Sequence, residues 1–229
     1  VNLEKSTLVP MQRFTFVGER FDLVRGLVFP TQEHLEEVLQ VVSRFLSSPA
    51  QSAWTWQTHL GVLGAQEQFN PFGSLHLRPL QLQLQHHWSA QRDPPDFLVQ
   101  LLDEVRQCLA WWSQPANLLK GQPLTPPPFS LRVFTDASTV GWGAHCQGQT
   151  VQGLWSPLEA ALHINVLEMR AVKLALESLQ VPAHQVVLVA SDNTSVVAYI
   201  NRQGGTRSPS LWTETTGLFD LVRALDIQL

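Results

Sequence analysis

Apolar residues recur at helical spacing through most of the first half of the chain. The pattern predicts an amphipathic helix over residues 32–47 and a second helix over 51–68. Residues 75–90 partly alternate as in a strand, yet their leucines also fit one helical face, which favours a helix. A fourth helix is expected to start at 93–96 and to continue to Trp112. The apolar positions expected to anchor these helices include Val38, Trp54, Leu63, Leu84 and Leu98.

Residues 14–29, ahead of the first helix, are rich in aromatic and β-branched side chains and are interrupted by Gly18 and Gly26. This composition predicts a small β-hairpin with its turn at Arg25-Gly26. Thr31 then precedes the first helical residue and is expected to be its N-cap. The first half is therefore predicted to be a hairpin followed by about four helices.

After residue 130 the pattern changes to short strands. Residues 131–134 form an apolar run that leads to Asp136, and the chain turns back into a second run over 141–146, which predicts a β-hairpin. Residues 185–191 form a continuous apolar run, as in a strand buried on both faces. The other expected elements are a strand over 150–155, helices over 166–180, 194–202 and 209–225, and a strand that starts at 226–229. The order β-β-β-α-β-α-α-β predicts a mixed α/β fold.

Between these halves, residues 115–130 contain three successive prolines, which suit neither a helix nor a central strand and which stiffen a spacer. The predicted organisation is a mostly helical region over 1–114, a proline-rich linker over 115–130 and an α/β domain over 131–229.

The composition fits a folded protein, since 44% of the 229 residues are apolar. Only 15% are charged and the formal net charge is −4, which argues against a strongly basic nucleic-acid surface. Cys108 and Cys146 form no metal or disulfide motif, so both are expected to be reduced core residues of an intracellular protein. No apolar run has the length of a membrane span, and the N-terminus lacks signal-peptide features and an initiating Met. A piece of a longer intracellular protein is expected.

Three acidic residues occupy the ends of predicted elements in the second half. Asp136 follows the first strand, Glu168 lies in the first turn of a helix, and Asp192 follows the fourth strand. If the first and fourth strands are neighbours, their carboxyl ends bring these acids to one crevice. Clustered carboxylates repel one another unless cations neutralise them, and all-oxygen ligands favour Mg²⁺ or Mn²⁺. Two such ions about 3.5–4 Å apart can promote phosphodiester hydrolysis.

Each acid also has an ordinary structural explanation. Asp136 could begin a turn. Glu168 stands three residues after Asn165, the spacing of a capping box. Asp192 could be the N-cap of the next helix. On spacing alone both the metal site and these local roles stay open.

Three segments, FTDAS, HINVLEMRAV and VASDNTSVVAYINRQGG, together resemble the type 1 ribonuclease H family. The resemblance covers residues 131–229 and is nearest to the ribonuclease H domains of retroelement reverse transcriptases, particularly DIRS-type elements. It implies a ribonuclease H-like fold that hydrolyses the RNA strand of RNA–DNA hybrids with Mg²⁺, or Mn²⁺ as the alternative ion, in a two-ion site.

Carried over by position, the resemblance implies that Asp136, Glu168 and Asp192 are catalytic metal ligands. Asn165 matches an Asn that contacts the hybrid near its 2′-hydroxyl groups, and Asn193 and Ser138 would contact the substrate backbone. The 2′-hydroxyl is the group that distinguishes RNA from DNA.

The first half is similar to the region that follows the polymerase motifs of such reverse transcriptases. Phe16-Val17-Gly18 matches the turn of the primer-grip hairpin, and residues 32–113 resemble the thumb and connection. The family's fourth carboxylate and its flexible His have no counterpart before Leu229, and the polymerase palm would lie upstream of Val1. An incomplete nuclease site without polymerase activity is therefore expected for this chain, with the upstream palm and fingers as its partner.

The sequence thus supports two main hypotheses. The first is metal-dependent cleavage of the RNA strand of hybrids within a retrotransposon reverse transcriptase. The second is a truncated, catalytically dead fragment that only binds nucleic acid. Another nuclease of the same superfold, such as an exonuclease or integrase, is a third possibility that substrate preference would separate.

Overall fold

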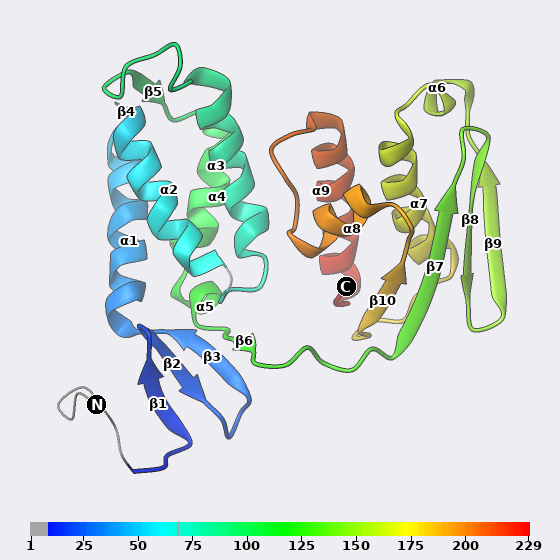
Figure 1. Ribbon diagram of the computed structural model, residues 1–229, viewed down its shortest axis with the longest axis horizontal. Coiled ribbons are helices and arrows are strands. Elements are labelled where there is room, and N and C mark those ends of the chain that lie inside the picture. The colour runs from blue at the N-terminus through cyan, green and yellow to red at the C-terminus, as the bar shows by residue number, and fades with distance from the viewer. Residues whose placement is uncertain (1–8, 68) are drawn as a thin grey trace. The chain divides into compact units, whose positions relative to one another are not determined.

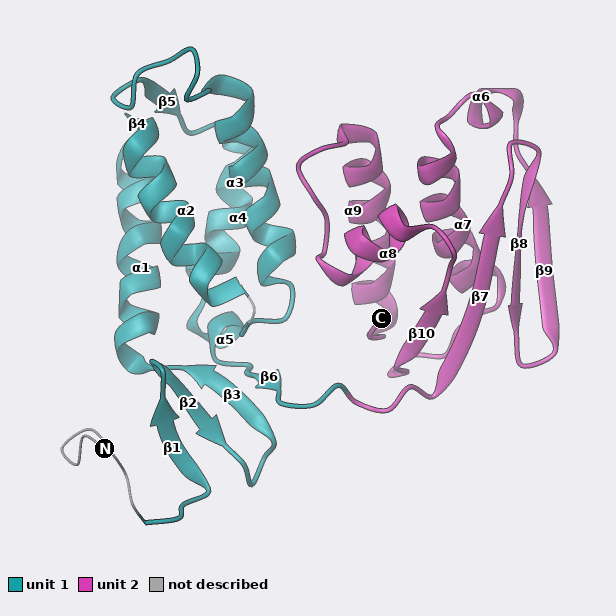
Figure 2. Ribbon diagram, viewed as in Figure 1, with its two compact units in different colours: residues 1–126 teal, residues 127–229 magenta. Residues whose placement is uncertain are grey.

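The computed structural model describes residues 9–67 and 69–229, and the chain divides into two compact units, residues 1–126 and 127–229 (Figure 2). The boundary lies within the proline-rich segment. The first part of that segment is not a spacer, because residues Pro115–Leu118 form helix α5 and Gln122–Pro123 form strand β6. Strand β6 pairs with β3 (Leu27–Pro30) and so belongs to the first unit.

The first unit begins with an antiparallel sheet in the order β1-β2-β3-β6 (Figure 1). Strands β1 (Arg13–Phe16) and β2 (Glu19–Asp22) precede β3, so the region predicted as one hairpin contains three strands. The additional turn is formed by Val17 and Gly18, whose φ angles are 51° and 82°. Two successive residues with positive φ close a two-residue hairpin loop, which a β-branched Val rarely does.

Four longer helices pack around one apolar core in this unit. They are α1 (Gln32–Ser47), α2 (Ala53–Glu67), α3 (Gly73–His87) and α4 (Asp103–Trp112). The hydroxyl of Thr31 accepts a hydrogen bond from the backbone N–H of His34, which confirms the predicted cap. Trp54 is 64% exposed, and the tryptophan of α2 that lies in the core is Trp56. The anchor predicted at Trp54 is therefore wrong.

The fourth helix starts later than predicted. Residues Leu98–Gln100 form strand β5, which pairs antiparallel with β4 (Ala50–Ser52), and α4 begins at Asp103. Leu98 is consequently exposed rather than buried in a helix face. Pairing between strands about fifty residues apart in sequence leaves no trace in local periodicity, which explains the wrong prediction.

The second unit is a mixed α/β domain, as predicted. Its sheet has the order β10-β7-β8-β9, in which β10 is parallel to β7 and the other pairs are antiparallel. Helix α7 packs against β7, β8 and α9 (Figure 1). The elements are β7 (Leu131–Ala137), β8 (Gly141–Cys146), β9 (Gln149–Leu154), α6 (Pro157–Ala160), α7 (Ile164–Ser178), β10 (Val187–Ala190), α8 (Thr194–Asn201) and α9 (Pro209–Leu225).

Strand β10 differs from its prediction. It is the last strand on its side of the sheet, and only Val187 in it is fully buried, so it is not covered on both faces. The strand expected at 226–229 is present as a single parallel bridge between Gln228 and Val186. Of the two cysteines, Cys146 is buried as expected, whereas Cys108 is only half-buried, and neither forms a disulfide.

Candidate metal centre

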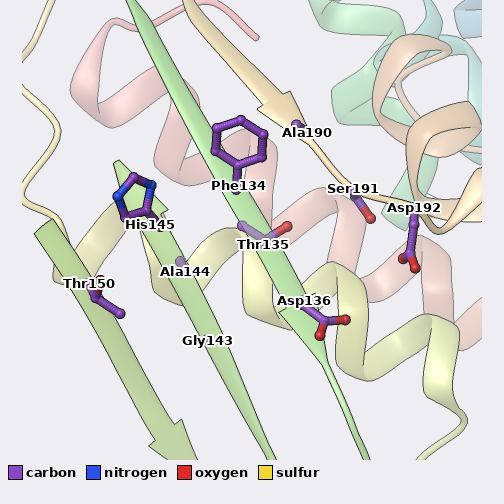
Figure 3. Close-up of a pocket in the computed structure, with 10 residues that line it drawn as sticks. All are labelled: Phe134, Thr135, Asp136, Gly143, Ala144, His145, Thr150, Ala190, Ser191 and Asp192. Carbon is purple, nitrogen blue, oxygen red and sulfur yellow. The ribbon is translucent and has the colours of Figure 1, made fainter. Parts of the chain in front are cut away.

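Two of the three acids come from neighbouring parallel strands. Asp136 is the last residue but one of β7 and pairs with Gly143 in β8. Asp192 follows the end of β10 by two residues. Because β7 and β10 run in the same direction, their carboxyl ends meet at one edge of the sheet. Figure 3 shows the side chains of Asp136 and Asp192 at these two strand ends.

The third acid, Glu168, comes from helix α7, which packs on β7 and β8. Its side chain is buried at 4% exposure, whereas Asp136 and Asp192 are exposed. One carboxylate oxygen from each acid lies within 4.8 Å of the others. The structure therefore brings together the three acids that the sequence singled out.

The local explanation for Asp136 does not hold. Asp136 is a strand residue, and the turn that follows is made by Ser138. The hydroxyl of Ser138 accepts hydrogen bonds from the backbone N–H groups of Val140 and Gly141. Ser138, predicted as a substrate contact, thus has a defined role within the β7–β8 turn, and Asp136 is left without a turn function.

The capping roles considered for the other two acids are also filled by neighbours. The N-cap of α7 is His163, so Asn165 and Glu168 do not form a capping box. The N-cap of α8 is Asn193, whose side chain accepts hydrogen bonds from the backbone N–H groups of Ser195 and Val196. Glu168 therefore takes no part in a capping box at the start of α7, and Asp192 is not the N-cap of α8.

Glu168 lies in an environment that disfavours its charged form. Burial raises the pKa of its carboxyl group, and the negative charges of Asp136 and Asp192 raise it further, while a backbone hydrogen bond from Ala137 opposes this. Among the described residues, its Oε2 atom has no hydrogen-bond partner. A buried carboxylate oxygen without a partner costs free energy, and a cation beside it would remove that cost.

The donor set suits a hard divalent cation. All three ligands are carboxylate oxygens, which favour Mg²⁺ or Mn²⁺ over softer metals. A cavity of about 600 Å³ lies beside two of them, lined by Asp136, Asp192 and the sheet residues Phe134, His145 and Thr150 (Figure 3). The cluster could therefore hold a metal ion next to a space that is open to a ligand.

The two predicted asparagines lie beside this cluster and contact each other. The Nδ2 atom of Asn193 donates to Oδ1 of Asn165 at 2.9 Å. Asn193 directly follows Asp192, and Asn165 precedes Glu168 by one helical turn. The sequence did not indicate this contact, nor the buried Thr135 hydroxyl and the Ala137 backbone group beside the acids, because each depends on tertiary packing.

Comparisons with known proteins found similar solved structures but no matching family model or curated sequence. No protein-family model matches the chain, and no curated protein matches it in sequence. Three solved structures of foamy viral protease-reverse transcriptase are similar to it, each at 14% identity. They are a form called dRH with double-stranded DNA (TM-score 0.41), a complex with an RNA/DNA hybrid (0.40) and a complex with double-stranded DNA (0.40).

These matches cover 94% to 95% of this chain and 28% to 44% of the viral chains, so the chain spans less than half of each. Likenesses at this identity and TM-score assign neither a family nor an activity. The fold and the site by themselves define a mixed α/β domain with a three-carboxylate candidate cation site. Within the described residues, no helix has the length and apolar character needed to cross a membrane.

Proposed function

We propose that this chain is part of a retroelement reverse transcriptase and that residues 131–229 form a ribonuclease H domain. Its reaction is the metal-dependent hydrolysis of the RNA strand of an RNA–DNA hybrid. The observation that carries the proposal is the convergence of Asp136, Glu168 and Asp192, whose carboxylate oxygens lie within 4.8 Å of one another. The resemblance of the segments around these acids to type 1 ribonucleases H supplies the substrate class.

In this proposal Asp136 and Asp192, which line the cavity, would hold two Mg²⁺ or Mn²⁺ ions, while the buried Glu168 would hold one of them. Bound ions of this kind activate a water and stabilise the leaving oxygen of a phosphodiester. Ser138, Asn165 and Asn193 lie around the acids, and we propose that Ser138 and Asn165 contact the hybrid. Residues 1–114, with their primer-grip-like hairpin, correspond to the thumb and connection, and the upstream palm and fingers are the partner. We place this reaction inside the cell.

The test is cleavage of a hybrid with a labelled RNA strand by the whole chain, in Mg²⁺ and in Mn²⁺. We expect Asp136→Asn to reduce cleavage by at least about a hundredfold, because one of three ligands is lost. Asp220→Asn is a matched control, since Asp220 is exposed and pairs with Arg223 on its own helix. Equal cleavage by the Asp136→Asn and Asp220→Asn variants would contradict the proposal.

The same assay separates the alternatives. Binding of the hybrid without cleavage, even at saturating Mn²⁺, would identify a binding-only fragment. Cleavage of duplex or single-stranded DNA in preference to the hybrid would identify another nuclease of the same superfold.

A further inference from the structure

Both polar atoms of the Asn193 side chain make hydrogen bonds within the protein. Its Oδ1 atom accepts from the backbone N–H groups of Ser195 and Val196, both at 3.1 Å, which caps helix α8. Its Nδ2 atom donates to Oδ1 of Asn165 on helix α7 at 2.9 Å. Asn193 therefore links the loop that carries Asp192 to the helix that carries Glu168.

These contacts fix which way both amide groups point. Backbone N–H groups can only donate, so the atom of Asn193 that faces them must be its oxygen, and its NH₂ group must face Asn165. The atom of Asn165 that accepts this hydrogen bond must then be its side-chain oxygen. Its NH₂ group is directed away from Asn193, and among the described residues it has no protein partner. The group that Asn165 directs away from Asn193 is thus the NH₂ donor and not the carbonyl oxygen.

We propose that Asn193 is a positioning residue: it orients the amide of Asn165 so that the Asn165 NH₂ group donates to the 2′-hydroxyl oxygen of the RNA strand. This inference rests on the proposed function and assigns Asn193 a role different from direct contact with the substrate. Asn165 lies one turn before Glu168 on α7, so the two side chains share a face of the helix. Asn165 therefore lies on the same side of α7 as Glu168.

The chemistry of discrimination follows from this orientation. A 2′-hydroxyl oxygen accepts a hydrogen bond, whereas a deoxyribose offers no atom at that position. A donor that is already fixed in place loses little entropy when it bonds the 2′-hydroxyl oxygen. The hydrogen bond therefore contributes more to the preference for RNA. A freely rotating amide would present its oxygen as often as its NH₂ group. Asn193 thus determines how strongly Asn165 distinguishes RNA from DNA.

The test compares the whole chain and its variants by the ratio of their affinities for an RNA–DNA hybrid and a DNA duplex of the same sequence. Affinities are measured in Ca²⁺, which takes the same oxygen ligands. Asn193→Ser keeps a good N-cap but has no group that reaches Asn165. We expect it to lower the ratio by about three- to tenfold, the worth of one hydrogen bond. Asn165→Ala should have the same effect.

The double variant is the decisive arm. If the two residues act as a unit, Asn193→Ser together with Asn165→Ala lowers the ratio no further than either change alone. Ser208→Ala is the matched control, because it removes the N-cap of α9 and should lower stability while leaving the ratio unchanged.

The inference is overturned if Asn193→Ser retains the full preference while Asn165→Ala loses it, or if the two effects multiply. That result would leave the proposed function intact. A chain with no preference for the hybrid and no cleavage of it would instead overturn the proposed function, and this inference with it.

Discussion

Glu168 has an environment that differs from those of the two aspartates, because it is buried while they are exposed. Burial and the two neighbouring charges raise the pKa of its carboxyl group above the ordinary value of 4.5. The folded state therefore binds the Glu168 proton more tightly than the unfolded chain does. The favourable contribution is present below pH 4.5 and is lost as the pH rises through the folded pKa.

Glu168→Gln should consequently stabilise the metal-free protein at neutral pH. We expect a gain on the order of 1 kcal/mol, or roughly 4–8 °C in Tm for a domain of about 100 residues, because no charge is then buried. The gain should disappear near pH 4, where Glu168 is protonated. Thermal unfolding in a chelator between pH 4 and pH 8 measures both effects, and a variant less stable than the unmodified chain at pH 7 would refute the expectation.

Glu159 provides a control of opposite sign. Hydrogen bonds from Ser156, and then from Arg170, lower the pKa of its carboxyl group. Its contribution to stability is therefore present above the ordinary pKa of 4.5 and is lost as the pH falls through the lower folded value. Glu159→Gln should accordingly destabilise the protein at neutral pH and have little effect in acid.

At the level of single residues, the sequence identified the three acids but not what surrounds them. Their positions at element ends are visible in the order of apolar runs and acids. The hydrogen bond between Asn165 and Asn193 joins residues 28 positions apart, and the helix ends could have been capped equally well by Asn165 and Asp192. Which neighbour caps a helix depends on where the helix begins within one or two residues, and periodicity does not resolve this.

At the level of elements, strands β8 and β9 approach each other closely at a glycine. A methyl group on Gly141 would overlap the backbone carbonyl oxygen of Gly153 in the neighbouring strand. Backbone atoms cannot rotate away as a flexible side chain can, so the strands would have to separate. The hairpin that carries Asp136 therefore depends on a glycine at this position.

Gly141→Ala should lower the free energy of unfolding by about 1–3 kcal/mol, the usual cost of overpacking. Gly143→Ala in the same strand is the control, since its nearest neighbour, the Val151 carbonyl oxygen, is at an ordinary 3.9 Å. Urea unfolding of both variants checks this. Equal stability of the two variants would show that β9 moves without cost.

Elements with strong local periodicity were predicted well, and those defined by long-range pairing were not. Helix α1 has the predicted bounds, β7 and β8 form the predicted hairpin, and β9 lies where the third strand was predicted. The three-residue strands β4 and β5 exist only because they pair with each other. Local sequence carries no information about such a partner.

At the level of the whole molecule, each unit has elements and buried residues of its own. The core of the first unit includes Trp56, Leu80 and Trp112, and that of the second includes Leu167 and Leu218. Residues 123–126 and 128–130, at the boundary between the units, are exposed. A substitution that destabilises one core is therefore expected to lower mainly the stability of its own unit.

Leu80→Ala tests this. Leu80 is fully buried, so its truncation should cost the first unit about 2–5 kcal/mol. We expect calorimetry to show a lowered unfolding transition, while the affinity of the chain for Mn²⁺ stays within about twofold of the unmodified protein. A parallel loss of Mn²⁺ binding would show that the two units do not act separately.

The central claim is that three carboxylates from β7, α7 and the β10–α8 loop form a divalent cation site. Titration of the whole chain with Mn²⁺, followed by electron paramagnetic resonance of the free ion, tests it most directly. The account predicts saturable binding that Asp136→Asn weakens by about tenfold or more and that Asp220→Asn leaves unchanged. Equal Mn²⁺ affinity in the unmodified chain and in Asp136→Asn, or no binding by either, would contradict it.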